Sequence, residues 1–219
     1  MGEQEVQRTF LEMIAQRFND GGPFMWVILV VLAVAVAVAI ERLIFYLYLC
    51  RGNPVQLVSE VAKRLNNDDV NGAKQAVCCR RTPSFVLMRT ALERFESGMG
   101  IEDIQEGVDE AAIDELPKMS KRLNYLALFA NVATLLGLLG TISGLQVSFD
   151  SLATVEAAKK SVMLSKGISQ AMNTTAFGLI VAVPCMVMYT VLSNQRDRLV
   201  KELDEAVVRM MNYLKKKLS

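Results

Sequence analysis

The chain has 219 residues, of which 52% are hydrophobic and 21% are charged, and its formal net charge is +1. Its positive mean hydropathy of +0.29 favours a membrane protein with polar parts outside the bilayer over an ordinary soluble domain. Because the sequence has no histidine, we expect no enzyme, no cofactor and no metal site. The basic residues are scattered, which argues against nucleic acid as a partner.

Residues 1–22 are predicted to form an amphipathic helix on the periplasmic side. Phe10, Ile14 and Phe18 recur there every four residues, as on the apolar face of a helix that lies on a membrane or packs on its own protein. This segment holds four acidic and two basic residues, so a cleavable signal peptide is a poor fit. The apolar segment that follows is therefore predicted to remain as an anchor.

Three apolar segments are predicted to cross the membrane. The first is residues 23–50, which opens with an uncharged run to Ile40 that is long enough to cross a hydrocarbon core of about 30 Å. The second and third are residues 123–149 and 167–195, joined by a periplasmic loop at residues 150–166. All of these segments read as helices, so the predicted fold is an all-α membrane protein with three transmembrane helices.

The remaining segments are predicted to form a cytoplasmic helical bundle, into which the second and third transmembrane helices extend. Residues 51–122, a helical loop, hold eleven Lys or Arg, and residues 196–219, a helical tail, hold seven, whereas residues 150–166 hold three. By the positive-inside rule, the N-terminus is periplasmic and the C-terminus is cytoplasmic. An apolar stripe at helical spacing predicts that the tail packs against another helix. It comprises Leu199, Leu203, Val207, Met210 and Leu214.

Two matching stripes of small and polar residues run along the second and third transmembrane helices. The first stripe comprises Ala130, Thr134, Gly137, Thr141, Gly144 and Ser148. The second comprises Gly167, Ala171, Thr175, Gly178, Ala182 and Cys185. Spacings of three and four residues place each set on one helix face. Lipid provides no hydrophobic drive for helices to associate, so close packing depends on small residues. The glycines predicted to serve this packing are the Gly140 and Gly144 pair, Gly137 and Gly178.

The polar residues of these two helices also favour a wet interior. One threonine can bond back to its own helix, but several together with an asparagine indicate a polar lumen. The candidates to line that lumen, beside Thr141 and Thr175, are Thr134, Ser148, Asn173 and Thr174. Neither helix holds a charged residue, so a proton-conducting protein of this kind would need a titrating carboxylate from another polypeptide. Glu41, beside Arg42, is interpreted as a snorkelling or paired boundary residue.

The polar stripes carry a resemblance to a known family. The run LLGLLGTISGLQVSF from Leu135, followed by KGISQAMNTTAFGLIVAVP at Lys166–Pro184, resembles the signature of the ExbB, TolQ and MotA family of ion-driven motor subunits. The pair of Glu41 and Arg42 after the first span is also similar. The likeness covers the three-span plan over nearly the whole chain and favours the ExbB and TolQ branch over the four-span MotA branch.

The resemblance implies a bacterial inner-membrane subunit that forms a homopentamer around two copies of a single-span partner similar to ExbD or TolR. In that family an aspartate of the partner carries the proton, and proton flow drives mechanical work on the cell envelope, in transport, envelope maintenance or motility. By motif, Thr141 and Thr175 match the two lumen-facing threonines of the family's ion pathway, and Pro184 matches the proline of its third span. Gln170 stands where relatives often have a glutamate, which places more of the titration on the partner.

A second function stays open alongside the motor subunit. In a structural membrane scaffold the small-residue stripes would serve helix packing only, and no ion would move. A membrane protease of the kind that uses a serine in a glycine-rich turn is disfavoured, because its nucleophile needs a histidine base.

Overall fold

The computed structural model describes residues 21–50, 54–67, 69–78, 82–154 and 156–218, and each element in these ranges is an α-helix. Three helices contain segments that are long and apolar enough to cross a membrane, as the sequence predicted. They are α2 (Pro23–Cys50), α7 (Asn124–Thr154) and α8 (Ala157–Leu218). The amphipathic helix predicted within residues 1–22 lies outside the described residues, which begin at Gly21.

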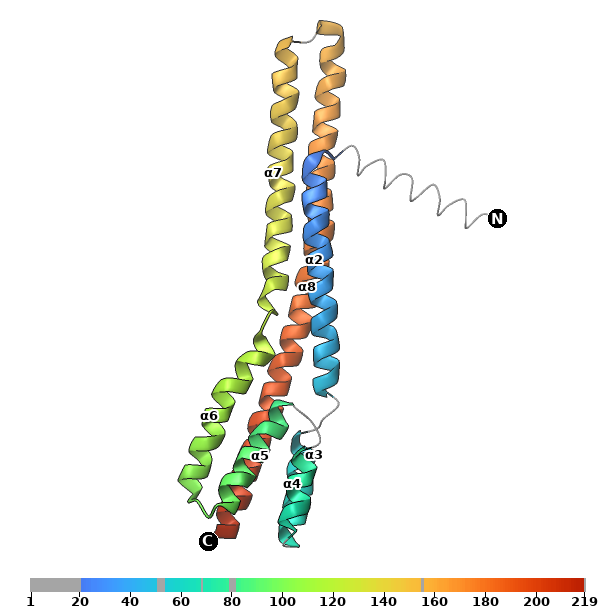
Figure 1. Ribbon diagram of the computed structural model, residues 1–219. Helices are drawn as coiled ribbons and strands as arrows, with labels where there is room; N and C mark the ends of the chain where they lie inside the picture. The colour runs from blue at the N-terminus through green and yellow to red at the C-terminus, as the bar shows by residue number, and fades with distance from the viewer. Residues whose placement is uncertain (1–20, 51–53, 68, 79–81, 155, 219) are drawn as a thin grey trace, which may run out of the picture. The chain divides into compact units, whose positions relative to one another are not determined.

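The described residues divide into two compact units. The first unit contains α2 up to Ile40, α7, and α8 up to Thr190. The second unit contains the chain from Glu41 to Leu123 and the rest of α8 from Val191. In Figure 1, α7 and the part of α8 that belongs to the first unit run side by side as a long antiparallel pair.

In the first unit α7 and α8 approach each other closely enough for their backbones to touch. A Cβ atom added to Gly178 would lie 2.7 Å from the carbonyl oxygen of Ala133 and 3.1 Å from the Cα of Gly137. One added to Gly144 would lie 3.3 Å from the backbone nitrogen of Ala171. Glycine is needed at Gly178 because any side chain there would collide with backbone atoms. The two predicted small-residue stripes therefore face each other within one chain, and we call their contact the α7–α8 seam.

Helix α2 packs on the first unit through one narrow stripe. Ile28 and Ala35 are buried and belong to a small apolar cluster with residues of α7 and α8. The cluster partners are Ala130, Ala133, Val181, Ala182 and Cys185. Most other side chains of α2 are apolar and exposed, from Trp26 to Tyr48. Such a surface is stable only against lipid or another apolar surface, which agrees with a membrane-spanning role.

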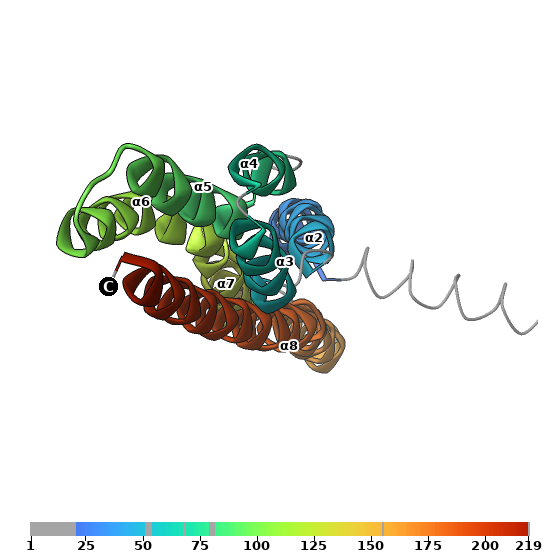
Figure 2. The same ribbon diagram turned by 90° about the horizontal axis from the view of Figure 1, so that it is seen from below.

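The second unit is a bundle of short helices around the far end of α8. Its helices are α3 (Pro54–Asn66), α4 (Val70–Cys78), α5 (Pro83–Glu96) and α6 (Ile101–Ser120). Helix α5 packs against α4 and α6, and α4 packs against α3 (Figure 2). The tail stripe predicted from the sequence enters the core, where Leu203, Met210 and Leu214 are buried.

Local sequence signals account for the helix ends in this unit. Thr82 occupies the N-cap position of α5, with Pro83 as the first helical residue, where its missing N–H costs nothing. Gly98, at φ 72°, then turns the chain between α5 and α6. Glu102 and Asp103 lie in the first turn of α6, where carboxylates stabilise the positive end of the helix dipole.

The connection between α6 and α7 differs from the expected continuous extension of the second transmembrane helix. Helix α6 ends at Ser120, and Arg122 adopts a left-handed backbone at φ 64°, which interrupts an α-helix. The helix is thus interrupted at residues 121–123 before α7 starts. An ion pair from Arg122 to Glu41, at 2.7 Å, holds this conformation from a distant part of the sequence.

The connection between α7 and α8 is much shorter than the loop predicted at residues 150–166. Helix α7 continues to Thr154, and α8 begins at Ala157. The polarity of this stretch indicated a loop, but it holds no glycine or proline, and most of it continues the two helices. At about 1.5 Å per residue, the 31 residues of α7 span roughly 46 Å, which exceeds a hydrocarbon core of about 30 Å.

The seam predicts a specific sensitivity at Gly178. Gly178→Leu should lower the free energy of unfolding by about 2–3 kcal/mol, because the added side chain forces the helices apart. The thermal unfolding midpoint in detergent should fall by roughly 5–10 °C. Ala176→Leu is the matched control, since Ala176 lies two residues away on the exposed face of α8. Equal midpoints for the two variants would show that the seam is not tight in the folded protein.

Candidate functional site

Thr174 occupies the centre of the α7–α8 seam. Its side chain is fully buried, and its hydroxyl lies 2.8 Å from the carbonyl oxygen of Gly21 and 2.9 Å from that of Gln170. A Cβ atom on Gly140 would collide with this threonine side chain. Thr174 was a candidate to line a lumen, but within one chain it is enclosed by its own neighbours.

Ser148 has a similar place nearer the end of the seam. Its side chain is buried, and its hydroxyl donates to the carbonyl oxygen of Gly144 at 2.9 Å. Gly167 faces it from α8, where a Cβ atom would overlap the serine hydroxyl. Ser148 is therefore buried inside the chain, like Thr174.

Thr175, the neighbour of Thr174, lies at the edge of the seam and is half-buried. Its hydroxyl crosses to the other helix and donates to the carbonyl oxygen of Gly137 at 3.0 Å. The helices must be very close for a short threonine side chain to reach a backbone carbonyl of the partner helix. The hydrogen of this hydroxyl is used inside the chain, so its oxygen remains available as an acceptor.

Thr141 lies on α7 at the edge of the seam and is also half-buried. Its hydroxyl donates to the carbonyl oxygen of Leu138 in its own helix at 2.6 Å. Thr134, two helical turns away, is exposed and donates to the carbonyl oxygen of Ala130 at 3.0 Å. Asn173 on α8 is half-buried. The predicted polar set thus splits into buried residues that pack the seam and accessible residues along its edge.

The packing residues of the prediction divide in the same way. Gly137, Gly140, Gly144 and Gly178 all contact the opposite helix of the seam. Pro184 does not: it lies inside α8 on an exposed face, beyond these contacts. A proline inside a helix removes one backbone hydrogen bond, which is tolerated here without ending α8.

The contact of the chain before α2 with α8 was not foreseen from the sequence. Gly22, at φ 75°, turns the chain, and a Cβ atom on it would collide with the side-chain amide of Gln170. The carbonyl of the preceding Gly21 accepts the hydroxyl of Thr174. The Gly-Gly pair before an apolar run was the available signal, because only glycine allows this turn against a neighbouring helix.

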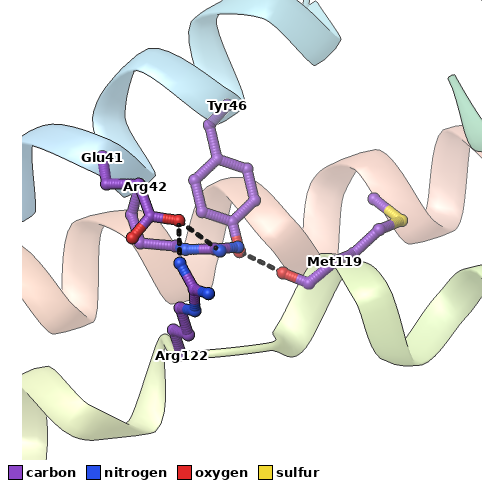
Figure 3. Close-up of polar contacts among 5 residues, drawn as sticks. All are labelled: Glu41, Arg42, Tyr46, Met119 and Arg122. Atoms are coloured by element: carbon purple, nitrogen blue, oxygen red, sulfur yellow. Dashed lines mark hydrogen bonds and ion pairs between the residues drawn. The ribbon is translucent and has the colours of Figure 1, made fainter. Parts of the chain in front are cut away.

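A second polar site, in the second unit, surrounds Glu41 (Figure 3). One oxygen of the Glu41 carboxylate accepts Nη2 of Arg42 at 3.0 Å and Nη1 of Arg122 at 2.7 Å. Nearby, the buried Tyr46 donates its hydroxyl to the carbonyl oxygen of Met119 at 2.6 Å. The prediction that Glu41 is paired is confirmed. The ion pair with Arg122 and the hydrogen bond from Tyr46 were not predicted, because each joins segments more than 70 residues apart.

The chemistry of the first unit is limited by what its helices lack. From Asn124 to Phe149 and from Gly167 to Thr190 no residue carries a charge. Within the described ranges, no group of three or more His, Cys, Asp or Glu side chains is placed to hold a metal ion. The edge of the seam therefore offers hydroxyl and amide groups as hydrogen-bond partners but has no group of its own that titrates near neutral pH.

Comparison with known proteins identifies the relatives of this chain. Residues 80–205, more than half of the chain, match the MotA/TolQ/ExbB proton channel family. Among individual relatives, an ExbB homologue of Methanothermobacter thermautotrophicus, named as a biopolymer transport protein, is 24% identical over 94% of this chain and 71% of its own length. The Tol-Pal system protein TolQ of Pseudomonas aeruginosa is 33% identical over 49% of this chain and 48% of its own length.

A further relative supports the same grouping. The biopolymer transport protein ExbB of Salmonella typhimurium is 30% identical over 51% of this chain. The matched region covers about half the length of this Salmonella relative and of the Pseudomonas TolQ, 48% in each case. The family match includes α5, α6, α7 and most of α8, and so contains the whole α7–α8 seam. With its three apolar helices, this chain is a multi-pass membrane protein that belongs to the MotA/TolQ/ExbB proton channel family.

Proposed function

We propose that the chain is the membrane subunit of a motor driven by the proton-motive force, of the ExbB and TolQ type. In this proposal it forms a homopentamer in the bacterial inner membrane, with its N-terminus in the periplasm and its C-terminus in the cytoplasm. The pentamer surrounds a dimer of a single-span partner similar to ExbD or TolR, and proton flow does mechanical work on the cell envelope. Membership of the family and the uncharged, hydroxyl-bearing edge of the seam support this function.

The missing charges determine where the titrating group must be. A proton crossing the hydrocarbon core needs a side chain that binds and releases it, and such groups are usually carboxylates. Helices α7 and α8 supply none within their apolar parts. The proposed partner therefore supplies the acid, and this chain supplies the surroundings in which that acid crosses the membrane.

The geometry of two threonines gives those surroundings a chemical preference. The hydroxyl hydrogens of Thr141 and Thr175 are both bonded to backbone carbonyls, of Leu138 and Gly137. Each oxygen is left as an acceptor, which suits the O–H of a protonated carboxylic acid and does not suit a carboxylate. Both threonines would thus stabilise the partner's acid in its neutral, proton-carrying form.

The scaffold alternative draws support from the buried part of the polar set. Thr174 and Ser148 are enclosed in the seam, as a purely structural function for the stripes would require. It gives no reason for the accessible hydroxyl of Thr141, whose one hydrogen bond among the described residues is to Leu138 of its own helix and not to α8. The two functions therefore differ in what they expect of Thr141.

Thr141→Val tests this difference. The swap keeps the side-chain volume and removes the hydroxyl, so we expect normal folding and assembly but a loss of proton flux into liposomes. The cost in folding free energy should stay below about 1 kcal/mol, since the lost bond is local and partly exposed. Thr190→Val is the matched control, because Thr190 is exposed and bonds Met186 in the same way, at 2.9 Å. Unchanged flux in Thr141→Val would favour the scaffold.

Co-purification tests the partner. The chain would be expressed with a single-span protein that carries an aspartate in its span, and native mass spectrometry would give the composition of the complex. We expect a pentamer that holds a dimer, and loss of proton flux without loss of assembly when that aspartate is changed to asparagine. Proton flux through liposomes that contain this chain alone would contradict the proposal, because it would require a titrating group in the chain itself.

A further inference from the structure

Asn131 is an exposed polar residue inside the apolar part of α7, and it was not among the candidates predicted to line a lumen. It lies seven residues from the start of the uncharged segment at residues 124–149. At 1.5 Å per residue, this places it about 10 Å from the nearer end of the segment. Its side-chain amide has no hydrogen-bond partner among the described residues. An amide at this depth is costly to leave against lipid, so it needs water or another polar group.

The hydroxyls of the same helix differ from Asn131 because they are satisfied locally. Thr134 donates to the carbonyl oxygen of Ala130 at 3.0 Å, and Thr141 donates to that of Leu138 at 2.6 Å. A hydroxyl that bonds its own helix in this way can be tolerated beside lipid. The amide of Asn131 has two N–H donors and a carbonyl acceptor, and the structure gives them no such bond. Asn131 is therefore not explained as a locally satisfied residue.

The position of Asn131 on the helix surface directs its side chain away from α2. Phe129 and Ala133 belong to the apolar cluster through which α7 and α8 contact α2. Each of them is two residues from Asn131, and two residues turn an α-helix by about 200°. Asn131 therefore lies on the side of α7 opposite α2, on a face of the α7–α8 pair that α2 does not cover.

Asn131 shares this face with the two accessible threonines of α7. Asn131, Thr134, Leu138 and Thr141 are spaced by three, four and three residues, so they follow one line along the helix. Thr134 is exposed and Thr141 is half-buried. Thr141 is ten residues from Asn131, which corresponds to about 15 Å along the helix axis. Polar groups thus continue from the edge of the seam toward the end of α7 at Asn124.

We propose that Asn131 lines the proton pathway and binds water between the threonines and the Asn124 end of α7. This inference rests on the proposed motor function, since it requires a pathway for protons along this face. An amide both donates and accepts hydrogen bonds, so it can hold a water molecule in either orientation. Thr141 offers an acceptor only, because its hydrogen is bonded to Leu138. The two residues therefore have different tasks: Thr141 faces the neutral acid of the partner, and Asn131 keeps the route to that acid hydrated.

Thiol labelling tests whether water reaches this position. The Asn131→Cys and Val30→Cys variants would be reconstituted with the single-span partner in liposomes and treated with a cationic methanethiosulfonate, and peptide mass spectrometry would measure modification at each position. Val30 is the matched control because it is 63% exposed on α2, two residues from the buried Ile28. We expect Asn131→Cys to react about tenfold faster, because the reagent attacks a thiolate in contact with water. Equally slow reaction at the two positions would overturn the inference.

Proton flux tests whether the amide is used. Asn131→Leu removes the amide at similar volume, and we expect it to lower flux through liposomes that contain the chain and its partner by about tenfold. Asn131→Gln restores an amide and should recover most of the flux. Asn124→Leu is the matched control, since it makes the same change at the first residue of α7, and should leave the flux unchanged. Loss of the assembled complex in Asn131→Leu, measured by native mass spectrometry, would show that the amide joins copies of the chain and does not line the pathway.

Failure of this inference can be distinguished from failure of the motor function. If the unchanged complex conducts protons and Asn131→Leu conducts equally well, the inference about Asn131 is wrong and the motor function stands. If the unchanged complex with its partner conducts no protons, the motor function is wrong and the inference fails with it.

Discussion

The contact between the α7 and α8 backbones at Gly137 and Gly178 is the constraint on which the first unit depends. Because no side chain separates the helices there, the hydroxyl of Thr175 can reach the carbonyl of Gly137 at 3.0 Å. The same contact fixes the rotation of α8 about its axis, which buries Thr174. Rotation of α7 is fixed likewise, with Gly144 in the seam and Thr141 at its edge. The glycines thus decide which hydroxyls are accessible.

The sequence was sufficient for the parts of the fold that depend on composition and spacing. Long uncharged runs gave three spans, and the first of them has the bounds of α2, Pro23–Cys50. It was not sufficient to distinguish Thr174 from Thr175. Neighbouring residues on a helix differ by about 100° in direction, which is as wide as the small-residue stripe itself. Only the positions of the facing glycines show which threonine points into the seam.

Long-range contacts explain the other differences between expectation and structure. The end of α6 is set by the left-handed backbone of Arg122, and its guanidinium is bound by Glu41, 81 residues earlier. An exposed ion pair of this kind contributes about 1 kcal/mol at most. Local propensity favoured a continuous helix from α6 into α7, and no local sequence pattern predicts the break at residues 121–123. Glu41 therefore has two functions in the structure, since it pairs a buried arginine and binds the arginine at the break between α6 and α7.

The two accessible threonines also have a consequence for how a proton would cross the membrane. A carboxylic acid that travels through a low-dielectric region must be neutral there, because an ionised carboxylate would carry a large desolvation cost. Surroundings rich in donors would stabilise the carboxylate and hold it in place. Hydroxyls whose hydrogens are already bonded to Leu138 and Gly137 offer acceptors instead. In the proposed motor they would favour the neutral acid at the seam, so ionisation and proton release would take place where water replaces the threonines.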